Sequence, residues 1–129
     1  MSEQEWLNWS NKCLSSSFNP TPDINLKKWE ITLTPDYFLR FRKTYQQGKQ
    51  EYFSFNLQRL THVDYLPGDT AGILRFNTQT DDIIVQTYED PEGNIDSMAT
   101  TLGLPVHSMN AARFDSLKSA LNYFRAKSL

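Results

Sequence analysis

Alternation of apolar and polar residues over 27–33 and 39–45 is the pattern that most restricts the fold of this chain. Side chains of a β-strand point alternately to opposite faces, so each run predicts a strand with one apolar face. Thr34-Pro35-Asp36 provides turn residues between the two runs, and Gln46-Gln47-Gly48 provides a second turn with glycine at the left-handed position. The sequence therefore predicts two consecutive hairpins.

The register of these hairpins follows from parity, because residues directly opposite each other share a face. If Leu33 lies opposite Leu39, then Glu30 falls opposite Arg42 on the outer, solvated face. A turn after Tyr45 extends the same arrangement to a third strand. The apolar face expected from the three strands contains Ile31, Leu33, Leu39, Phe41, Phe53 and Phe55.

Strand-like sequence continues to residue 104. Residues 51–66 predict one bent strand or two, with a kink near residues 56–60 where the alternation breaks. Further strand-like runs occupy residues 73–77, 83–89 and 95–104. Pro105 is expected to end sheet pairing, because proline has no backbone N–H to donate. Residues 26–104 thus predict about seven antiparallel strands.

Residues 1–14 predict an N-terminal helix that starts with the Ser-x-x-Glu spacing of a capping box, and residues 15–25 predict a loop. Trp6 and Trp9 lie on one side of this helix. Two tryptophans on a short helix indicate that the helix docks onto the body of the domain, or that it contacts a partner or a second copy in a homodimer. Trp6 and Trp9 are therefore the candidate partner-binding residues.

Residues 110–127 predict a C-terminal helix with Asn110 as its N-cap. Its apolar residues recur at steps of three and four, which places them on one stripe. Such a stripe must be covered, and the apolar face of the predicted sheet is the nearest surface that can cover it. The residues of the stripe are Phe114, Leu117, Leu121 and Phe124.

Composition indicates one globular domain spanning residues 1–129, with 39% hydrophobic and 22% charged residues. A net charge of −2 gives no indication of nucleic-acid binding. Cys13 is the only cysteine, which excludes an internal disulfide and favours a cytoplasmic location. Neither a signal peptide nor a run of roughly 20 apolar residues is present, so we expect a soluble protein without a membrane span.

No sequence motif indicates catalysis or nucleotide binding. His62 and Asp64 lie two residues apart, hence on one strand face, where they could form a base and its orienting carboxylate or part of a metal site. His107 is the only other histidine, and nothing in the spacing brings it near. The acidic residues within 81–96 lack the pattern of a calcium loop. We therefore expect a non-catalytic protein with no metal and no cofactor.

An α+β arrangement of about seven antiparallel strands followed by an amphipathic C-terminal helix resembles the pleckstrin-homology-like (PH-like) superfold. The resemblance covers Leu26 to Lys127 and implies a barrel or sandwich of two near-orthogonal sheets with the helix capping one end. In the predicted C-terminal helix of this chain, the aromatic residues of the apolar stripe are Phe114 and Phe124. Members of the superfold bind lipids, peptides or proteins, so the fold alone does not select among these functions.

The resemblance gives three hypotheses for function. The leading one is a binding module for a protein or peptide. A second is weak binding of phosphoinositides or other anionic lipids, because Lys28 with Arg40 and Arg42 matches the basic pattern of lipid-binding members. The plainer interpretation of those residues is a solvated strand face. The third is a barrel that holds a small apolar ligand in a cavity lined by Trp29, Phe41, Phe55 and Phe76.

Overall fold

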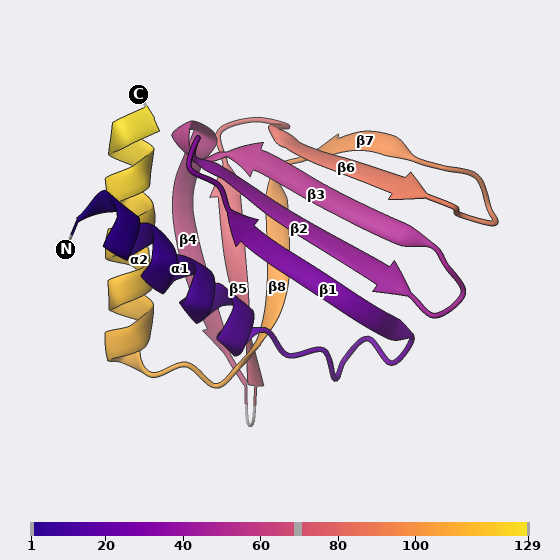
Figure 1. Cartoon of the computed structure of the whole chain (residues 1–129), viewed down its shortest axis with the longest axis horizontal. Coiled ribbons are helices and arrows are strands. Elements are labelled where there is room, and N and C mark those ends of the chain that lie inside the picture. Colours follow the sequence, from indigo (N-terminus) through magenta and orange to yellow (C-terminus); the bar gives the residue numbers. More distant parts are fainter. Residues whose placement is uncertain (1, 69–70, 129) are drawn as a thin grey trace.

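A computed structural model describes residues 2–68 and 71–128 of the chain. This part contains two α-helices, one short 3₁₀ helix and eight β-strands, with every strand pair antiparallel (Figure 1). In chain order the elements are α1 (Glu3–Ser17), β1 (Leu26–Leu33), β2 (Phe38–Tyr45), β3 (Gln50–Asn56), η1 (Leu57–Arg59), β4 (Leu60–Pro67), β5 (Ala71–Thr78), β6 (Ile83–Tyr88), β7 (Asp96–Ala99), β8 (Thr101–His107) and α2 (Ala111–Ser128).

The strands form two separate sheets. One has the order β1-β2-β3-β6-β7 and the other the order β4-β5-β8. The predicted α+β class with a helix at each end of the strands is confirmed, whereas no closed barrel is found in the described part of the chain. The strand expected over residues 95–104 is two strands in different sheets. They separate at Thr100, whose carbonyl accepts a hydrogen bond from the Thr78 N–H instead of continuing the ladder of β7.

The predicted register of the first three strands is confirmed. Leu33 pairs with Leu39, Glu30 pairs with Arg42, and the ladder between β2 and β3 continues the same parity. Gly48 has a φ of 100°, as the turn chemistry of the second hairpin requires. The inner face of the five-stranded sheet is therefore the apolar face, and the outer face carries the intervening polar and charged residues.

The break expected near residues 56–60 is also confirmed. The 3₁₀ turn η1 separates β3 from β4, and the Asn56 side chain caps it by accepting a hydrogen bond from the Gln58 N–H. Leu57 and Leu60, which interrupt the alternation in sequence, are both buried. The chain thus turns from one sheet into the other at a corner that packs into the core, where Phe55 and Phe76 place their ring centroids 6.1 Å apart.

The expectation that Pro105 ends sheet pairing is wrong. Pro105 lies within β8 and pairs with Ile73 on β5. Because β8 is the last strand of its sheet, a residue without an N–H is tolerated there. The free side of Pro105 is also covered, since its carbonyl accepts a 2.9 Å hydrogen bond from the Asn19 N–H.

Helix α1 begins with the predicted capping box but continues to Ser17, so part of the predicted loop over 15–25 is helical. The fully buried side of α1 is formed by Leu7, Ser10, Cys13, Leu14 and Ser17. Trp6 and Trp9 lie beside this stripe and are only partly buried. The extra turn is held by a contact from α2, which the sequence pattern of the loop does not reveal.

That contact is made by Arg113. Its guanidinium donates hydrogen bonds to the hydroxyls of Ser16 and Ser17 and to the carbonyl of Cys13. The C-terminal end of a helix carries a partial negative charge, so a cation placed there stabilises the end of α1. An arginine in the first turn of α2 is unfavourable for α2 itself, and this tertiary role accounts for it.

Helix α2 starts at the predicted cap, where the Asn110 side chain accepts a 2.8 Å hydrogen bond from the Arg113 N–H. Leu117, Leu121 and Phe124 are fully buried in the same core cluster as the apolar face of the first three strands. The helix lies at one end of the two sheets, beside α1 (Figure 1). Within the described residues, no helix is both long enough and apolar enough to cross a membrane.

Candidate functional site

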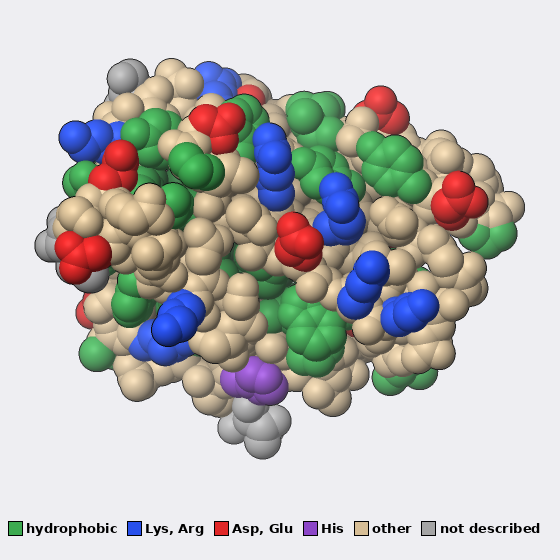
Figure 2. Space-filling view, in the orientation of Figure 1, with side chains coloured by type: hydrophobic (Ala, Val, Ile, Leu, Met, Phe, Trp, Pro, Cys, Tyr) green, Lys and Arg blue, Asp and Glu red, His purple; other side chains and the backbone are tan. Residues whose placement is uncertain are grey.

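The outer face of the five-stranded sheet is an open surface. It is the side seen in Figure 2, where lysine and arginine side chains gather over β1 and β2 with acidic side chains among them. The strand registers assign the exposed residues of this face, because alternate positions of paired strands point to the same side. We call this surface the outer face; its most exposed members are Lys28, Glu30, Arg40, Arg42, Ile84, Tyr88, Asp96 and Met98.

The three residues predicted as a lipid site, Lys28, Arg40 and Arg42, are brought together on the outer face. Arg40 and Arg42 occupy alternate positions of β2, and Lys28 lies on β1. Glu30 is directly opposite Arg42 in the ladder, yet no ion pair joins them in the described part of the chain. Although Glu30 lies opposite Arg42 as predicted, its carboxylate does not pair with the Arg42 guanidinium.

Each of the two guanidinium groups lies over an aromatic ring instead. The Arg40 guanidinium carbon is 5.6 Å from the centroid of Phe38, and that of Arg42 is 5.6 Å from the centroid of Tyr52. Such cation–π contacts hold the planar group against the sheet while leaving its N–H donors accessible. Two shallow hollows of about 140 and 130 Å³ lie beside the arginines, and both are lined by Glu30 and Arg42.

On β6 and β7 the outer face also carries exposed apolar side chains. Ile84 on β6 and Met98 on β7 are cross-strand partners that remain 37% and 50% exposed. Tyr88, on the same face of β6, is 45% exposed. Large apolar side chains left in water next to one another are costly, and such patches mark interaction surfaces.

Trp6 and Trp9, the residues predicted to bind a partner, lie where α1 meets α2. The Trp6 ring stacks on Tyr123 of α2 with centroids 6.4 Å apart, and Trp9 contacts Trp6 edge-on at 6.2 Å. Both tryptophans pack against the hydrophobic core while part of each stays exposed. Their contacts give them a role in joining the two helices.

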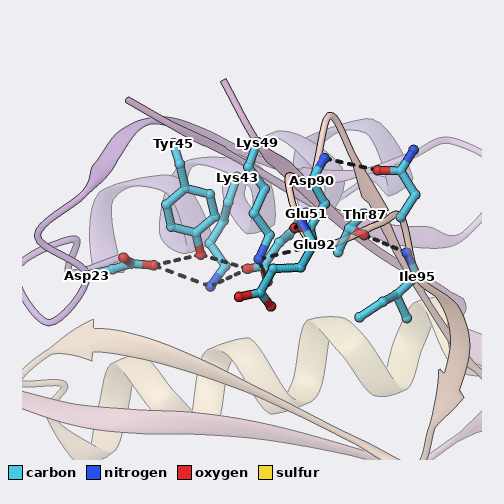
Figure 3. Close-up of polar contacts among 10 residues, drawn as sticks. Asp23, Lys43, Tyr45, Lys49, Glu51, Thr87, Asp90, Glu92 and Ile95 are labelled. Atoms are coloured by element: carbon cyan, nitrogen blue, oxygen red, sulfur yellow. Dashed lines mark hydrogen bonds and ion pairs between the residues drawn. The ribbon is translucent and has the colours of Figure 1, made fainter. Parts of the chain in front are cut away.

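A cluster of charged side chains that the sequence did not indicate lies at the far end of the inner face (Figure 3). Lys43 and Glu51 are cross-strand partners on β2 and β3, and Tyr45 follows on the same face of β2. Asp23 reaches them from the loop before β1. In sequence, Lys43, Tyr45 and Glu51 fall on the apolar parity of their strands, and this is the signal that could have identified them.

Hydrogen bonds and ion pairs connect the whole cluster (Figure 3). The Tyr45 hydroxyl is 2.9 Å from Asp23 Oδ2 and 2.7 Å from Glu51 Oε1, and Lys43 Nζ lies 3.7 and 3.5 Å from the same two oxygens. Lys49 extends the cluster by pairing with Glu51 and with Asp90. Charged groups brought close to the core are expensive unless paired, so this mutual pairing stabilises the sheet where the apolar residues end.

The tyrosine hydroxyl is the only group of this cluster that shares one proton between two acceptors. Burial, followed by the hydrogen bonds to Glu51 and Asp23, raises the pKa of Tyr45 above its ordinary value of 10.0. The Lys43 ammonium is 5.5 to 6.0 Å from the ring centroids of Phe41, Tyr45 and Phe53. The side chains pair with one another, and the cluster closes the end of the core.

His62 and Asp64 share a strand face, as predicted, with His62 Nε2 3.4 Å from Asp64 Oδ2. Asp64 also accepts hydrogen bonds from Arg75 and Asn77, and the Arg75 contact is the main reason that its pKa is lowered. His107 lies on β8 opposite Ala71. Among the described residues, no group of three or more His, Cys, Asp and Glu side chains is arranged to hold a metal ion.

Cys13 lies on the buried side of α1. Burial raises the pKa of its thiol, which keeps it in the less reactive protonated form. The environment is that of a structural cysteine.

Three of the four residues proposed to line a ligand cavity are part of the packed core. Phe41, Phe55 and Phe76 are at most 2% exposed, and Trp29 is 39% exposed at the rim, where it contacts Phe18. A largely apolar hollow of about 360 Å³ lies on the outer surface of the three-stranded sheet beside Leu66, Ile73 and Pro105. The interior positions named for a ligand are thus occupied by side chains.

Comparison of the chain with protein-family models, with curated protein sequences and with solved structures gives no match. Inference about function therefore depends on the surface and the contacts described above.

Proposed function

We propose that this chain is a non-catalytic binding module whose partner is a protein or a peptide. The observation that carries the proposal is the outer face, where an exposed apolar pair, Ile84 and Met98, shares one sheet surface with Arg40 and Arg42. Arginine, methionine and aromatic residues are enriched at protein interfaces, whereas lysine is depleted there. An open sheet face with this composition supports docking of another chain.

The PH-like resemblance is retained as a proposal about the fold. Two sheets with a C-terminal helix at their end support it, while strand closure into a barrel is not part of the support. The cytoplasmic location expected from the single cysteine is likewise proposed. Trp6 and Trp9 are kept as a second contact region, because part of each ring remains exposed beside α2.

The test compares two matched pairs of exposed apolar residues. Ile84 and Met98 are cross-strand partners on the five-stranded sheet, and Leu66 and Ile73 are cross-strand partners on the outer surface of the three-stranded sheet. The members of the control pair are 41% and 44% exposed, close to the values of the test pair. Both pairs are changed to threonine, which retains the preference for strands.

Affinity capture from the source cell is quantified by mass spectrometry for wild type and both double variants. We expect Ile84→Thr with Met98→Thr to lose a specific protein that wild type and the Leu66→Thr, Ile73→Thr control retain. Circular dichroism and thermal unfolding establish that both variants are folded. Identical sets of captured proteins for all three forms would contradict docking on the outer face.

A further inference from the structure

Arg40 and Arg42 differ from the arginines that hold the fold together. Arg59 pairs with Asp82 at 2.9 Å, Arg75 pairs with Asp64 at 3.1 Å, and Arg113 binds the end of α1. By contrast, the guanidinium groups of Arg40 and Arg42 make no hydrogen bond and no ion pair within the described residues, although both are exposed on an ordered strand.

Contacts with Phe38 and Tyr52 fix where these two unpaired groups lie. A guanidinium lying on a ring has lost part of its rotational freedom before any ligand arrives, so less entropy is lost when it binds. Its fork of N–H donors matches a carboxylate or a phosphate. The guanidinium groups of Arg40 and Arg42 are therefore pre-positioned to bind an anion.

The spacing of the pair indicates what kind of anion fits. Residues two apart on a strand are separated by about 6.6–6.8 Å, which is also the repeat of same-side side chains along any extended peptide. An extended segment lying along β2 can therefore present one acidic side chain to Arg40 and the next alternate one to Arg42. Lys28 adds a third cation to this area, and Glu30 and Asp36 contribute two anions, so the surface is locally positive on a chain whose net charge is −2.

Building on the proposed function, we propose that the partner contributes an extended acidic segment, with acidic residues at alternate positions, that binds along β2 through Arg40 and Arg42. Donors spaced along β2 favour an extended chain over a lipid headgroup, which needs donors that converge on one point.

The test measures binding of three fluorescein-labelled hexapeptides by fluorescence anisotropy. The first alternates Glu and Thr, the second has the same residues with the three Glu in succession, and the third replaces every Glu by Gln. We expect the alternating peptide to bind best and the Gln peptide not to bind. Binding should weaken with added salt, because charges at an exposed surface are screened.

Variants connect this binding to the two arginines. Arg40→Gln with Arg42→Gln is expected to weaken binding of the alternating peptide about tenfold or more, and the corresponding lysine pair less, since lysine keeps the charge without the fork. Arg75→Gln, which removes an arginine that already has a carboxylate partner on the other sheet, should bind like wild type.

Equal affinity of the double glutamine variant and wild type for the peptide, or no binding by wild type, overturns the inference. Arginine-dependent binding to vesicles containing phosphatidylinositol bisphosphate, without peptide binding, overturns it in favour of a lipid. The capture experiment separates this failure from that of the proposed function. A partner lost on changing Ile84 and Met98 but retained by the arginine variant contradicts only the acidic segment, whereas a partner retained by both contradicts the outer face itself.

Discussion

The side-chain amide of Asn11 exchanges two hydrogen bonds with the backbone of Leu33. Asn11 Nδ2 donates to the Leu33 carbonyl at 3.0 Å, and the Leu33 N–H donates to Asn11 Oδ1 at 2.8 Å. Leu33 is the last residue of β1, an edge strand whose outer N–H and C=O groups have no neighbouring strand. Asn11 thus replaces a strand at this point and attaches α1 to the sheet.

Asn11→Ala should lower the free energy of unfolding by about 2 kcal/mol, because both backbone groups of Leu33 lose partners in a partly buried position. Urea unfolding followed by circular dichroism measures the change. Asn8→Ala is the control, since Asn8 is exposed and its side chain accepts a hydrogen bond from Gln4 within the same helix. Equal stability of the two variants would show that the Asn11 contact contributes nothing.

Arg113→Ala should destabilise the protein by about 1 kcal/mol. The variant removes the donors that Arg113 provides to Ser16, Ser17 and Cys13, while it relieves a cation at the start of α2, and the first effect is the larger. Thermal unfolding compares it with Arg125→Ala near the end of α2. A variant more stable than wild type would mean that the helix dipole of α2 outweighs the contact with α1.

The strand register could be predicted because it depends on information carried within neighbouring segments. A slip of one residue would have put Phe41 and Leu39 in water, so only one register buries both. The corner at η1 was predictable for the same reason, since Leu57 and Leu60 break a local pattern. Such features need no knowledge of distant parts of the chain.

The features that the sequence did not predict depend on contacts between segments that are far apart in the chain. The helical turn through Ser17 depends on Arg113, 96 residues later, and the strand break at Thr100 depends on Thr78. The candidate site likewise has one feature that the sequence predicted and one that it did not. Local spacing placed Arg40 and Arg42 on one face, whereas their lack of a carboxylate partner is a matter of side-chain geometry that register alone does not determine.

The stack of Trp6 on Tyr123 should contribute measurably to stability. In a double-mutant cycle with Trp6→Ala and Tyr123→Ala, we expect a coupling free energy of about 1 kcal/mol, the magnitude typical of aromatic pairs. Chemical denaturation of the four proteins gives this value. If the coupling is absent and Trp6→Ala instead abolishes capture of a partner, Trp6 belongs to an interface.

Leu117→Asn should strongly destabilise the domain and lower its unfolding temperature. Leu117 is fully buried in α2, so the change removes apolar contacts and places an amide where no partner is available, a loss of about 3–5 kcal/mol out of a total of roughly 5–15 kcal/mol. Lys118→Asn, at the exposed neighbouring position, should unfold near the wild-type temperature. A Leu117→Asn protein with wild-type stability and weakened association would identify α2 as an interface.

Tyr45 should make the protein sensitive to alkali. Its pKa is raised in the folded state by burial and by Glu51 and Asp23, so the hydroxyl ionises in the unfolded chain first. Below about pH 9 both states hold the proton, and this group adds no pH dependence to stability. As the pH rises through 10, the unfolded state releases the proton while the folded state keeps it, and stability falls by up to about 1.4 kcal/mol per pH unit.

Tyr45→Phe removes this titration and keeps the ring that Lys43 contacts. We therefore expect the difference in unfolding free energy between wild type and Tyr45→Phe to be constant up to about pH 9 and to shift in favour of the variant above pH 10, the ordinary pKa of tyrosine. Urea denaturation at a series of pH values measures it, with Tyr88→Phe as the control because Tyr88 is exposed. Parallel curves for wild type and Tyr45→Phe across this range would mean that Asp23 and Glu51 do not hold the proton on Tyr45.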